Sequence, residues 1–175
     1  DSTKVKINAV KDYGAEIILC EPNEKSRQDT CDEVIKKTGA VFVHPFDDYR
    51  IIAGQATAAK ELIEEVEDLD IIMTPVGGGG LSAGTALAAK YLDPSMEVIL
   101  GEPENVDDTY RSMESGKIQP VNGTKTIADG LKTTVGEKNF EIIHENVKEV
   151  ITVREKQIVE AMHMVWERMK IIIEP

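Results

Sequence analysis

The stretch that decides the fold reads Thr74-Pro75-Val76-Gly77-Gly78-Gly79-Gly80-Leu81-Ser82-Ala83-Gly84. It joins the apolar run at residues 70–76, typical of a strand buried on both faces, to an Ala- and Gly-rich segment at residues 81–92 that predicts a tightly packed helix. Ordering consecutive glycines costs backbone entropy, so in a folded chain they mark positions where a Cβ would not fit. A glycine loop between a strand and a helix directs backbone N–H groups to one point, which suits a phosphate.

The glycine run fits neither G-x-G-x-x-G nor G-x-x-x-x-G-K-[ST], so a Rossmann dinucleotide site and a P-loop are poor matches. A flexible linker is the other interpretation. Linkers prefer polar, serine-rich neighbours, whereas Pro75, Val76 and Leu81 flank this run. The pattern therefore favours an ordered anion-binding loop.

Strand-like and helix-like segments alternate along the rest of the chain, which predicts an α/β fold with a parallel, doubly wound sheet. Further strands are predicted at residues 15–20, 40–43, 97–100 and 149–153, and further helices at residues 3–13, 24–37, 51–67, 137–146 and 154–173. The last helix is amphipathic, and its inward apolar residues are expected in the core. The loop at residues 44–48 is the expected domain boundary, so residues 1–47 and 48–175 form separate parts.

Composition limits the function classes. The 175 residues are 41% hydrophobic and 30% charged, with a formal net charge of −12, which disfavours nucleic acid and anionic membrane surfaces as partners. No apolar run approaches the roughly 20 residues that cross a bilayer, and the chain opens without a secretory signal pattern. Cys20 and Cys31 form no metal-binding or disulfide pattern, as expected of a reduced, cytoplasmic protein.

The tetraglycine loop (residues 77–80) resembles that of the fold-type II pyridoxal-phosphate enzymes, the serine racemase and serine/threonine dehydratase group, where it wraps the cofactor phosphate. Residues 6–21, 126–130 and 165–175 extend the resemblance, and the last two segments are most similar to the eukaryotic serine racemase branch. The resemblance implies a tryptophan synthase β-like fold, with residues 1–47 in the small domain and residues 48–175 in the large cofactor domain. It also implies pyridoxal 5'-phosphate contacts at Gly77, Gly78, Gly79, Gly80 and Gly130.

An acidic segment follows the predicted strand at residues 97–100. Its carboxylates and an intervening carbonyl can converge on a hard divalent cation, although acidic loops are more often simply solvated. The resemblance implies Mg²⁺ or Ca²⁺ held by Glu102, the carbonyl of Val106 and Asp108, with a structural or activating role.

Both ends of the chain carry positions that match an activating ATP site at the dimer interface of serine racemases. These are Ala9, Tyr13, Lys170 and Glu174. Without the resemblance, Ala9 and Tyr13 are simply neighbours on one helix face, and Lys170 with Glu174 is an i, i+4 surface ion pair. The resemblance also implies a homodimer.

A pyridoxal-phosphate enzyme needs a lysine that binds the cofactor covalently, which in this family lies in a Ser-x-Lys-x-Arg-Gly type motif. That motif is absent from these 175 residues, as is the family's substrate carboxylate loop. We therefore expect the catalytic lysine to lie outside this chain, the chain to be a portion of a longer one, and the chain alone to be inactive.

The expected function is that of a pyridoxal-phosphate-dependent serine racemase, interconverting L-serine and D-serine, with elimination to pyruvate and ammonia as a side activity. A threonine/serine dehydratase is the alternative within the family. A non-catalytic binding module is the alternative if these residues form the complete protein.

Overall fold

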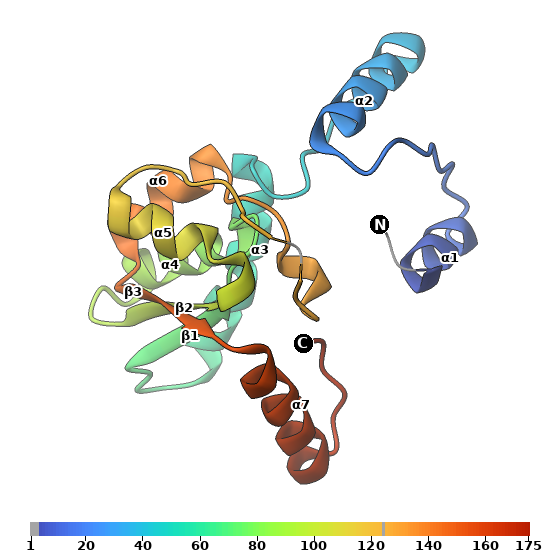
Figure 1. Ribbon diagram of the computed structural model, residues 1–175. Coiled ribbons are helices and arrows are strands. Elements are labelled where there is room, and N and C mark those ends of the chain that lie inside the picture. Colours follow the sequence, from blue (N-terminus) through green and yellow to red (C-terminus); the bar gives the residue numbers. More distant parts are fainter. Residues whose placement is uncertain (1–3, 124) are drawn as a thin grey trace. The chain divides into compact units, whose positions relative to one another are not determined.

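The computed structural model describes residues 4–123 and 125–175. The chain divides into two compact units, Asp1–Val43 and His44–Pro175. Figure 1 shows the elements of each unit in chain order. The assignment of the units to a small and a large domain stays a prediction.

The first unit contains two helices, α1 (Lys4–Asp12) and α2 (Glu24–Thr38). The Asn23 side chain caps α2 by accepting the Ser26 N–H at 2.8 Å, and Gly39 ends the helix with a left-handed φ of 71°. The strands predicted at residues 15–20 and 40–43 are wrong, because both segments are irregular. A strand needs a neighbour for its backbone hydrogen bonds, and the described part of this unit offers none.

The second unit is built on a parallel sheet of β1 (Ile71–Pro75), β2 (Glu97–Pro103) and β3 (Glu149–Val153), in that spatial order. Ile72 pairs with Val98, and Leu100 pairs with Val150. The α/β class with parallel strands is thereby confirmed. The helices are α3 (Tyr49–Glu65), α4 (Gly80–Leu92), α5 (Asp108–Ser115), α6 (Glu137–Asn146) and α7 (Glu155–Met169), with short 3-10 turns η1 (Glu104–Val106) and η2 (Asp129–Leu131).

The core lies between one face of the sheet and α4, which contacts both α3 and α6 (Figure 1). Ile72, Val98 and Leu100 are buried on this face. A Cβ at Gly84 of α4 would lie 2.6 Å from the Ala56 nitrogen of α3, so glycine allows these helices their close approach. Burial of α4 therefore fixes the position of its N-terminus, where the tetraglycine loop joins the helix.

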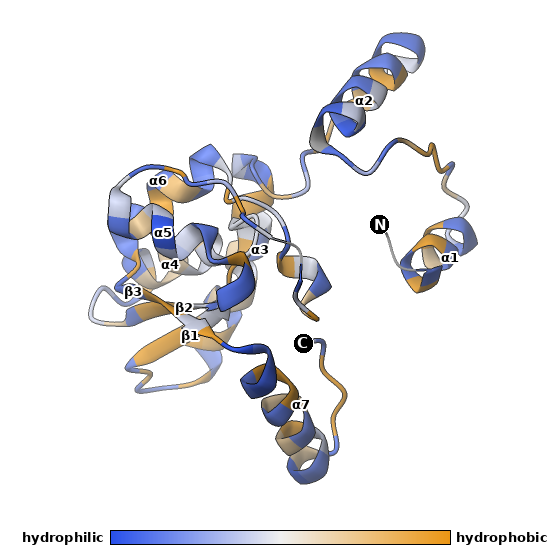
Figure 2. Cartoon of the chain, viewed as in Figure 1, coloured by the Kyte–Doolittle hydropathy of each residue, from blue (hydrophilic) through white to orange (hydrophobic). Residues whose placement is uncertain are grey.

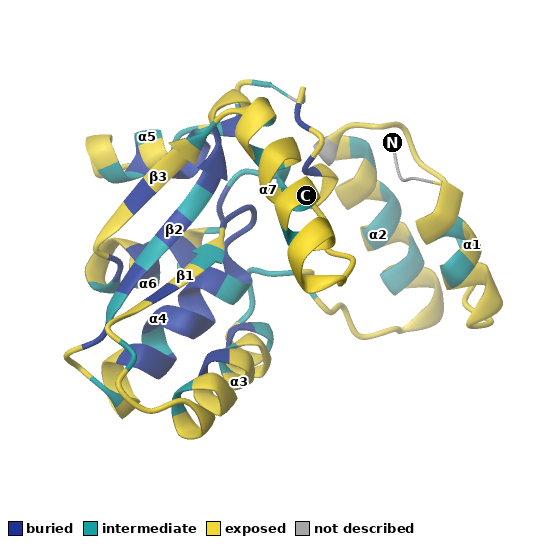
Figure 3. Cartoon of the chain, turned by 90° about the horizontal axis from the view of Figure 1, so that it is seen from below, coloured by how far each residue is buried: buried dark blue, intermediate teal, exposed yellow. Residues whose placement is uncertain are grey.

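The opposite face of the sheet is open within the described residues. Ile71, Met73 and Ile151 are 48%, 53% and 37% exposed, and Figure 3 shows exposed residues on either side of a buried one in β1, and intermediate residues alternating with buried ones in β2. The expectation that the strand at residues 70–76 is buried on both faces is therefore wrong for this chain, because nothing described covers the second face.

Helix α7 ends earlier than predicted. Lys170 has a left-handed φ of 60° and terminates it, so residues 170–173 are not helical. The helix has no buried residue, and Trp166 and Met169, which the sequence placed around its apolar face, are 61% and 63% exposed. Figure 2 shows the apolar segment that follows α7.

Candidate cofactor-phosphate and cation sites

The tetraglycine loop connects β1 to α4, and all four glycines are buried. Gly79 is the N-cap of α4 with a left-handed φ of 91°, and its carbonyl accepts the Ala83 N–H at 2.8 Å. Ser82 donates from its hydroxyl to the Pro75 carbonyl at 3.0 Å, which ties the first turn of α4 to the end of β1. The strand and the helix thus hold the loop from both sides.

A Cβ would be closely approached by the surrounding protein at every position of the loop, most severely at Gly78 and Gly79. A Cβ at Gly77 would lie 3.0 Å from Leu131 Cα, and one at Gly79 would lie 2.9 Å from Asn139 Cβ. At Gly78 it would overlap the Phe46 ring, and at Gly80 it would lie 3.1 Å from the Phe46 carbonyl oxygen. The expectation that these glycines mark close approaches is therefore confirmed.

The backbone N–H groups of Gly77, Gly78 and Gly79 donate to no protein group among residues 4–123 and 125–175. Buried N–H groups almost always have a partner, so three consecutive ones without a protein acceptor point to an external anion. They lie at the N-terminus of the 13-residue helix α4, where the helix dipole adds partial positive charge. We refer to these three N–H groups as the phosphate cradle, and their chemistry fits a phosphate group.

Gly130 lies beside the loop, since a Cβ at Gly77 would be 3.1 Å from the Gly130 carbonyl oxygen. A Cβ at Gly130 itself would meet nothing within 4 Å, so the space next to it is open. The structure thus brings Gly130 and the tetraglycine loop together, as the sequence expectation requires. Glu155 anchors the preceding segment, because its Oε2 accepts the Ile127 N–H at 2.9 Å.

Glu102 and Asp108 form the second candidate site, at the carboxyl end of β2, the middle strand of the sheet. Glu102 is in β2 and Asp108 begins α5, and both are at most 1% exposed. The Glu102 carboxylate accepts the Thr109 N–H at 3.0 Å and the Tyr110 N–H at 2.9 Å. Asp108 Oδ2 accepts the Val135 N–H at 2.9 Å, whereas Asp108 Oδ1 is buried without a partner among the described residues.

Burial of these two acids strongly disfavours their charged forms. Burial, with a smaller contribution from the nearby Asp108, raises the pKa of Glu102 to about 7, although the backbone hydrogen bonds from Tyr110 and Thr109 act to lower it. Burial also raises the pKa of Asp108 to about 6. Two buried carboxyl groups with an unpartnered oxygen fit a divalent cation, which would stabilise their ionised forms.

The cation set named from the sequence is Glu102, Val106 and Asp108, and all three residues are buried around η1 and the start of α5. Among the described residues, no three His, Cys, Asp or Glu side chains gather as a metal-binding group. A cation here would therefore depend on backbone carbonyl or water oxygens in addition to the two carboxylates.

The proposed effector residues lie in different units. In the first unit, Tyr13 is 87% exposed and donates its N–H to the Ala9 carbonyl at 3.1 Å, so the two share a helical turn. In the second, Lys170 Nζ donates to the Glu167 carbonyl at 2.6 Å. The alternative of an i, i+4 ion pair between Lys170 and Glu174 is wrong, because α7 ends before both residues.

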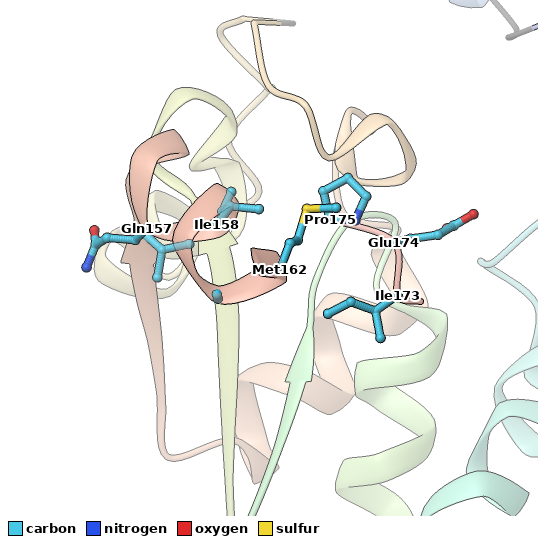
Figure 4. A pocket seen from close by; sticks show the side chains of 8 residues that line it. Gln157, Ile158, Met162, Ile173, Glu174 and Pro175 are labelled. Atoms are coloured by element: carbon cyan, nitrogen blue, oxygen red, sulfur yellow. The ribbon is translucent and has the colours of Figure 1, made fainter. Parts of the chain in front are cut away.

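An apolar pocket of about 350 Å³ lies between α7 and the segment that follows it (Figure 4). Ile158, Met162 and Ile173 contribute apolar side chains, and Glu174 is at its edge. It is separate from the tetraglycine loop, and no residue of the cation set lines it.

Sequence reasoning missed three residues that shape the loop, namely Phe46, Asp47 and Asn139. The available signal was Gly136, which precedes a predicted helix but has no side chain with which to cap it. A glycine N-cap leaves the first N–H groups of the helix to water or to another residue, and the sequence does not say which. None of the described helices is both long and apolar enough to cross a membrane.

Comparison with known proteins identifies the family. The family model described as "Pyridoxal-phosphate dependent enzyme" matches residues 1–175. Serine racemase from Dictyostelium discoideum is 51% identical over 177 residues, covering 100% of this chain and 55% of the relative. Its crystal structure superposes with a TM-score of 0.93, covering 100% of this chain and 56% of that one.

Relatives with other reactions also match. The beta-hydroxyaspartate dehydratase of Paracoccus denitrificans is 42% identical, covering 98% of this chain and 55% of the relative. The crystal structure of a T.th. threonine deaminase is 38% identical with a TM-score of 0.92, covering 97% of this chain and 57% of that one. The chain thus spans about half the length of these relatives, and it belongs to the family of fold-type II pyridoxal-phosphate-dependent enzymes.

Proposed function

We propose that this chain supplies the cofactor-phosphate and cation-binding part of a pyridoxal-phosphate-dependent serine racemase that also converts serine to pyruvate and ammonia. The observation that carries the proposal is the phosphate cradle, in which three buried N–H groups at the start of α4 have no described protein acceptor. Similarity to serine racemases supports serine as the substrate.

When bound, pyridoxal phosphate supplies an electron sink that acidifies the Cα–H of an amino acid. In this proposal the chain's own residues bind and orient rather than move protons. The N–H groups of Gly77, Gly78 and Gly79 hold the phosphate, and Gly80 lets α4 begin directly behind them. Gly130, with open space beside it, would lie next to the cofactor ring.

The proposed cation, Mg²⁺ or Ca²⁺, is held by Glu102, Asp108 and the Val106 carbonyl. The unpartnered Asp108 Oδ1 and the raised pKa of both acids support this assignment. The Glu102 carboxylate also binds the first turn of α5, and Asp108 binds Val135 near the loop. A cation would therefore stabilise the ends of β2 and α5 rather than take part in the chemistry.

The proposal extends to a cytoplasmic homodimer activated by ATP at Ala9, Tyr13, Lys170 and Glu174. Within the first unit, the exposure of Tyr13 is compatible with contact to a nucleotide. Both cysteines are free thiols, as suits a reducing compartment.

A threonine/serine dehydratase is the second candidate, favoured by the similarity to a threonine deaminase structure. The cradle and the cation site do not distinguish the two reactions, because the proposal assigns them to the cofactor phosphate and a cation.

An assay of the full-length protein that contains this chain decides between the candidates. Purified protein is given pyridoxal phosphate, Mg²⁺ and either L-serine or L-threonine, and D-serine, pyruvate and 2-oxobutyrate are measured. We expect D-serine and pyruvate from L-serine. Faster 2-oxobutyrate formation without D-serine would make the protein a dehydratase. Cofactor binding without turnover of either amino acid would indicate a binding module.

A further inference from the structure

Asn139 of α6 lies directly behind the phosphate cradle. Its side chain is fully buried, and a Cβ on Gly79 would lie 2.9 Å from Asn139 Cβ. Its amide nitrogen Nδ2 donates two hydrogen bonds, to the Gly78 carbonyl at 2.7 Å and to the Phe46 carbonyl at 3.1 Å. One side chain therefore joins the tetraglycine loop to the loop that precedes α3.

The Gly78 carbonyl is held from two directions, because it also accepts the Gly136 N–H at 3.1 Å. In a planar trans peptide, the C=O of one residue and the N–H of the next point in opposite directions. The described chain contains no cis peptide bond. Fixing the Gly78 oxygen toward α6 therefore fixes the Gly79 N–H so that it points away from α6, which makes it one of the unpartnered donors of the cradle.

Asn139 is itself held in place by the same neighbours. Its backbone N–H donates to Asp47 Oδ1 at 3.3 Å, next to the Lys138 N–H at 3.0 Å. Asp47 follows Phe46, whose ring excludes a Cβ at Gly78. The result is a closed set of contacts among α6, the segment at residues 46–47 and the tetraglycine loop, all within the second unit.

We infer that Asn139 is a positioning residue for the cofactor phosphate: it fixes the Gly78–Gly79 peptide so that its N–H faces the anion. This inference rests on the proposed function of the tetraglycine loop. A glycine backbone has no side chain to restrict it, so it needs such an external constraint to hold its donors ready.

The test compares the binding of pyridoxal phosphate and of pyridoxal, which lacks the phosphate, to the full-length protein. The variants are Asn139→Leu, which has a similar shape but no donor, and Asn139→Ser, which retains one smaller donor. Asn146→Ala is the matched control, because Asn146 is on the same helix and also donates to a backbone carbonyl, that of Ile142 at 2.7 Å.

We expect Asn139→Leu to weaken pyridoxal phosphate binding about tenfold or more while pyridoxal binding changes less than about twofold. Asn139→Ser should lie between Asn139→Leu and the unaltered protein, and Asn146→Ala should bind both ligands as the unaltered protein does. If Asn139→Leu does not fold, the ratio measured for Asn139→Ser decides.

An equal loss of affinity for both ligands, or no change in a folded variant, would overturn the inference, because a merely structural residue does not discriminate phosphate. If the unaltered protein binds pyridoxal as tightly as pyridoxal phosphate, the proposed cradle itself fails. The two failures are therefore distinguishable.

Discussion

At the scale of single residues, the glycines of the tetraglycine loop pack against residues from other segments of the chain, and Gly78 and Gly80 share Phe46 as a neighbour. Phe46 excludes a side chain at Gly78, Asn139 and Val135 exclude one at Gly79, and Leu131 excludes one at Gly77. These contacts come from residues distant in sequence, so protein packing alone already disfavours side chains in the loop, most strongly at Gly78 and Gly79. Anion binding then uses the N–H groups that this packing leaves without acceptors.

Gly78→Ala should destabilise the protein by about 1–3 kcal/mol, as overpacking does, because its Cβ would overlap the Phe46 ring. In a Phe46→Ala background the same change should cost clearly less, because the obstructing ring is gone. Urea unfolding of the four proteins in this double-mutant cycle measures the coupling. Additive effects would show that Phe46 is not the obstacle.

Unlike Gly78→Ala, Gly130→Ala should leave the stability of the folded protein almost unchanged. A Cβ at Gly130 meets no protein atom within 4 Å, so the stability of the cofactor-free protein should change by less than about 1 kcal/mol. If the cofactor ring lies in that space, affinity for pyridoxal phosphate should nevertheless fall. Thermal unfolding and a cofactor titration check the two parts, and unchanged affinity would remove Gly130 from the proposed site.

The pair Glu102 and Asp108 predicts a pH dependence of stability. Their pKa values rise from 4.5 to about 7 and from 3.8 to about 6 on folding, so between about pH 4 and pH 7 the folded protein binds more protons than the unfolded chain. Stability from this pair is therefore lost as pH rises through that window. In a chelator we expect the melting temperature to fall by on the order of 5 °C.

Mg²⁺ should reduce that fall, because a bound cation favours the ionised carboxylates. Asp108→Asn, which removes one titrating group, should flatten the pH profile in chelator and weaken the effect of Mg²⁺. Identical melting curves with and without the cation across this pH range would argue against a cation site at these residues.

At the scale of elements, α6 receives its N-terminal cap from a distant residue. Its N-cap residue Gly136 has no side chain, and Asp47 Oδ1 accepts the Lys138 and Asn139 N–H groups instead. A side chain at Gly136 would collide with Asp47. The cap thus links the start of α6 to the segment beside the tetraglycine loop.

Asp47→Ala should destabilise the protein by about 1 kcal/mol, the usual effect of losing a helix cap. Asp47→Asn should recover most of that loss, because the amide oxygen still accepts a hydrogen bond, although it lacks the carboxylate's attraction for Lys138. Chemical denaturation measures both variants. Equal stability of Asp47→Ala and the unaltered protein would show that the cap is dispensable.

Local pattern was sufficient for several elements of the second unit. The strand at residues 149–153 and the helix at residues 137–146 were predicted with the bounds observed. Helix α5 was not predicted, because it is only eight residues long with a single aliphatic side chain, Met113, and its first turn is held by Glu102 of β2. Such tertiary hydrogen bonds leave no trace in a single sequence.

At the scale of the whole molecule, the failed strand predictions share one cause. The segments at residues 15–20 and 40–43 have strand-like composition, yet Leu19 and Val41 are 82% and 80% exposed. Ile71 and Met73, on the open face of the sheet, are also exposed apolar residues. Composition correctly indicates that these residues are suited to burial, but a strand or a covered face also needs a partner, which residues 4–123 and 125–175 do not provide.

Phosphate binding by the tetraglycine loop can be followed directly in a phosphorus-31 NMR titration of pyridoxal phosphate into the full-length protein. If the N–H groups of the loop hold the phosphate, its bound resonance should stay constant between about pH 6 and pH 8, because those donors stabilise the dianion. Asn139→Leu should partly restore the titration. A bound resonance that titrates like that of the free cofactor would contradict phosphate binding by this loop.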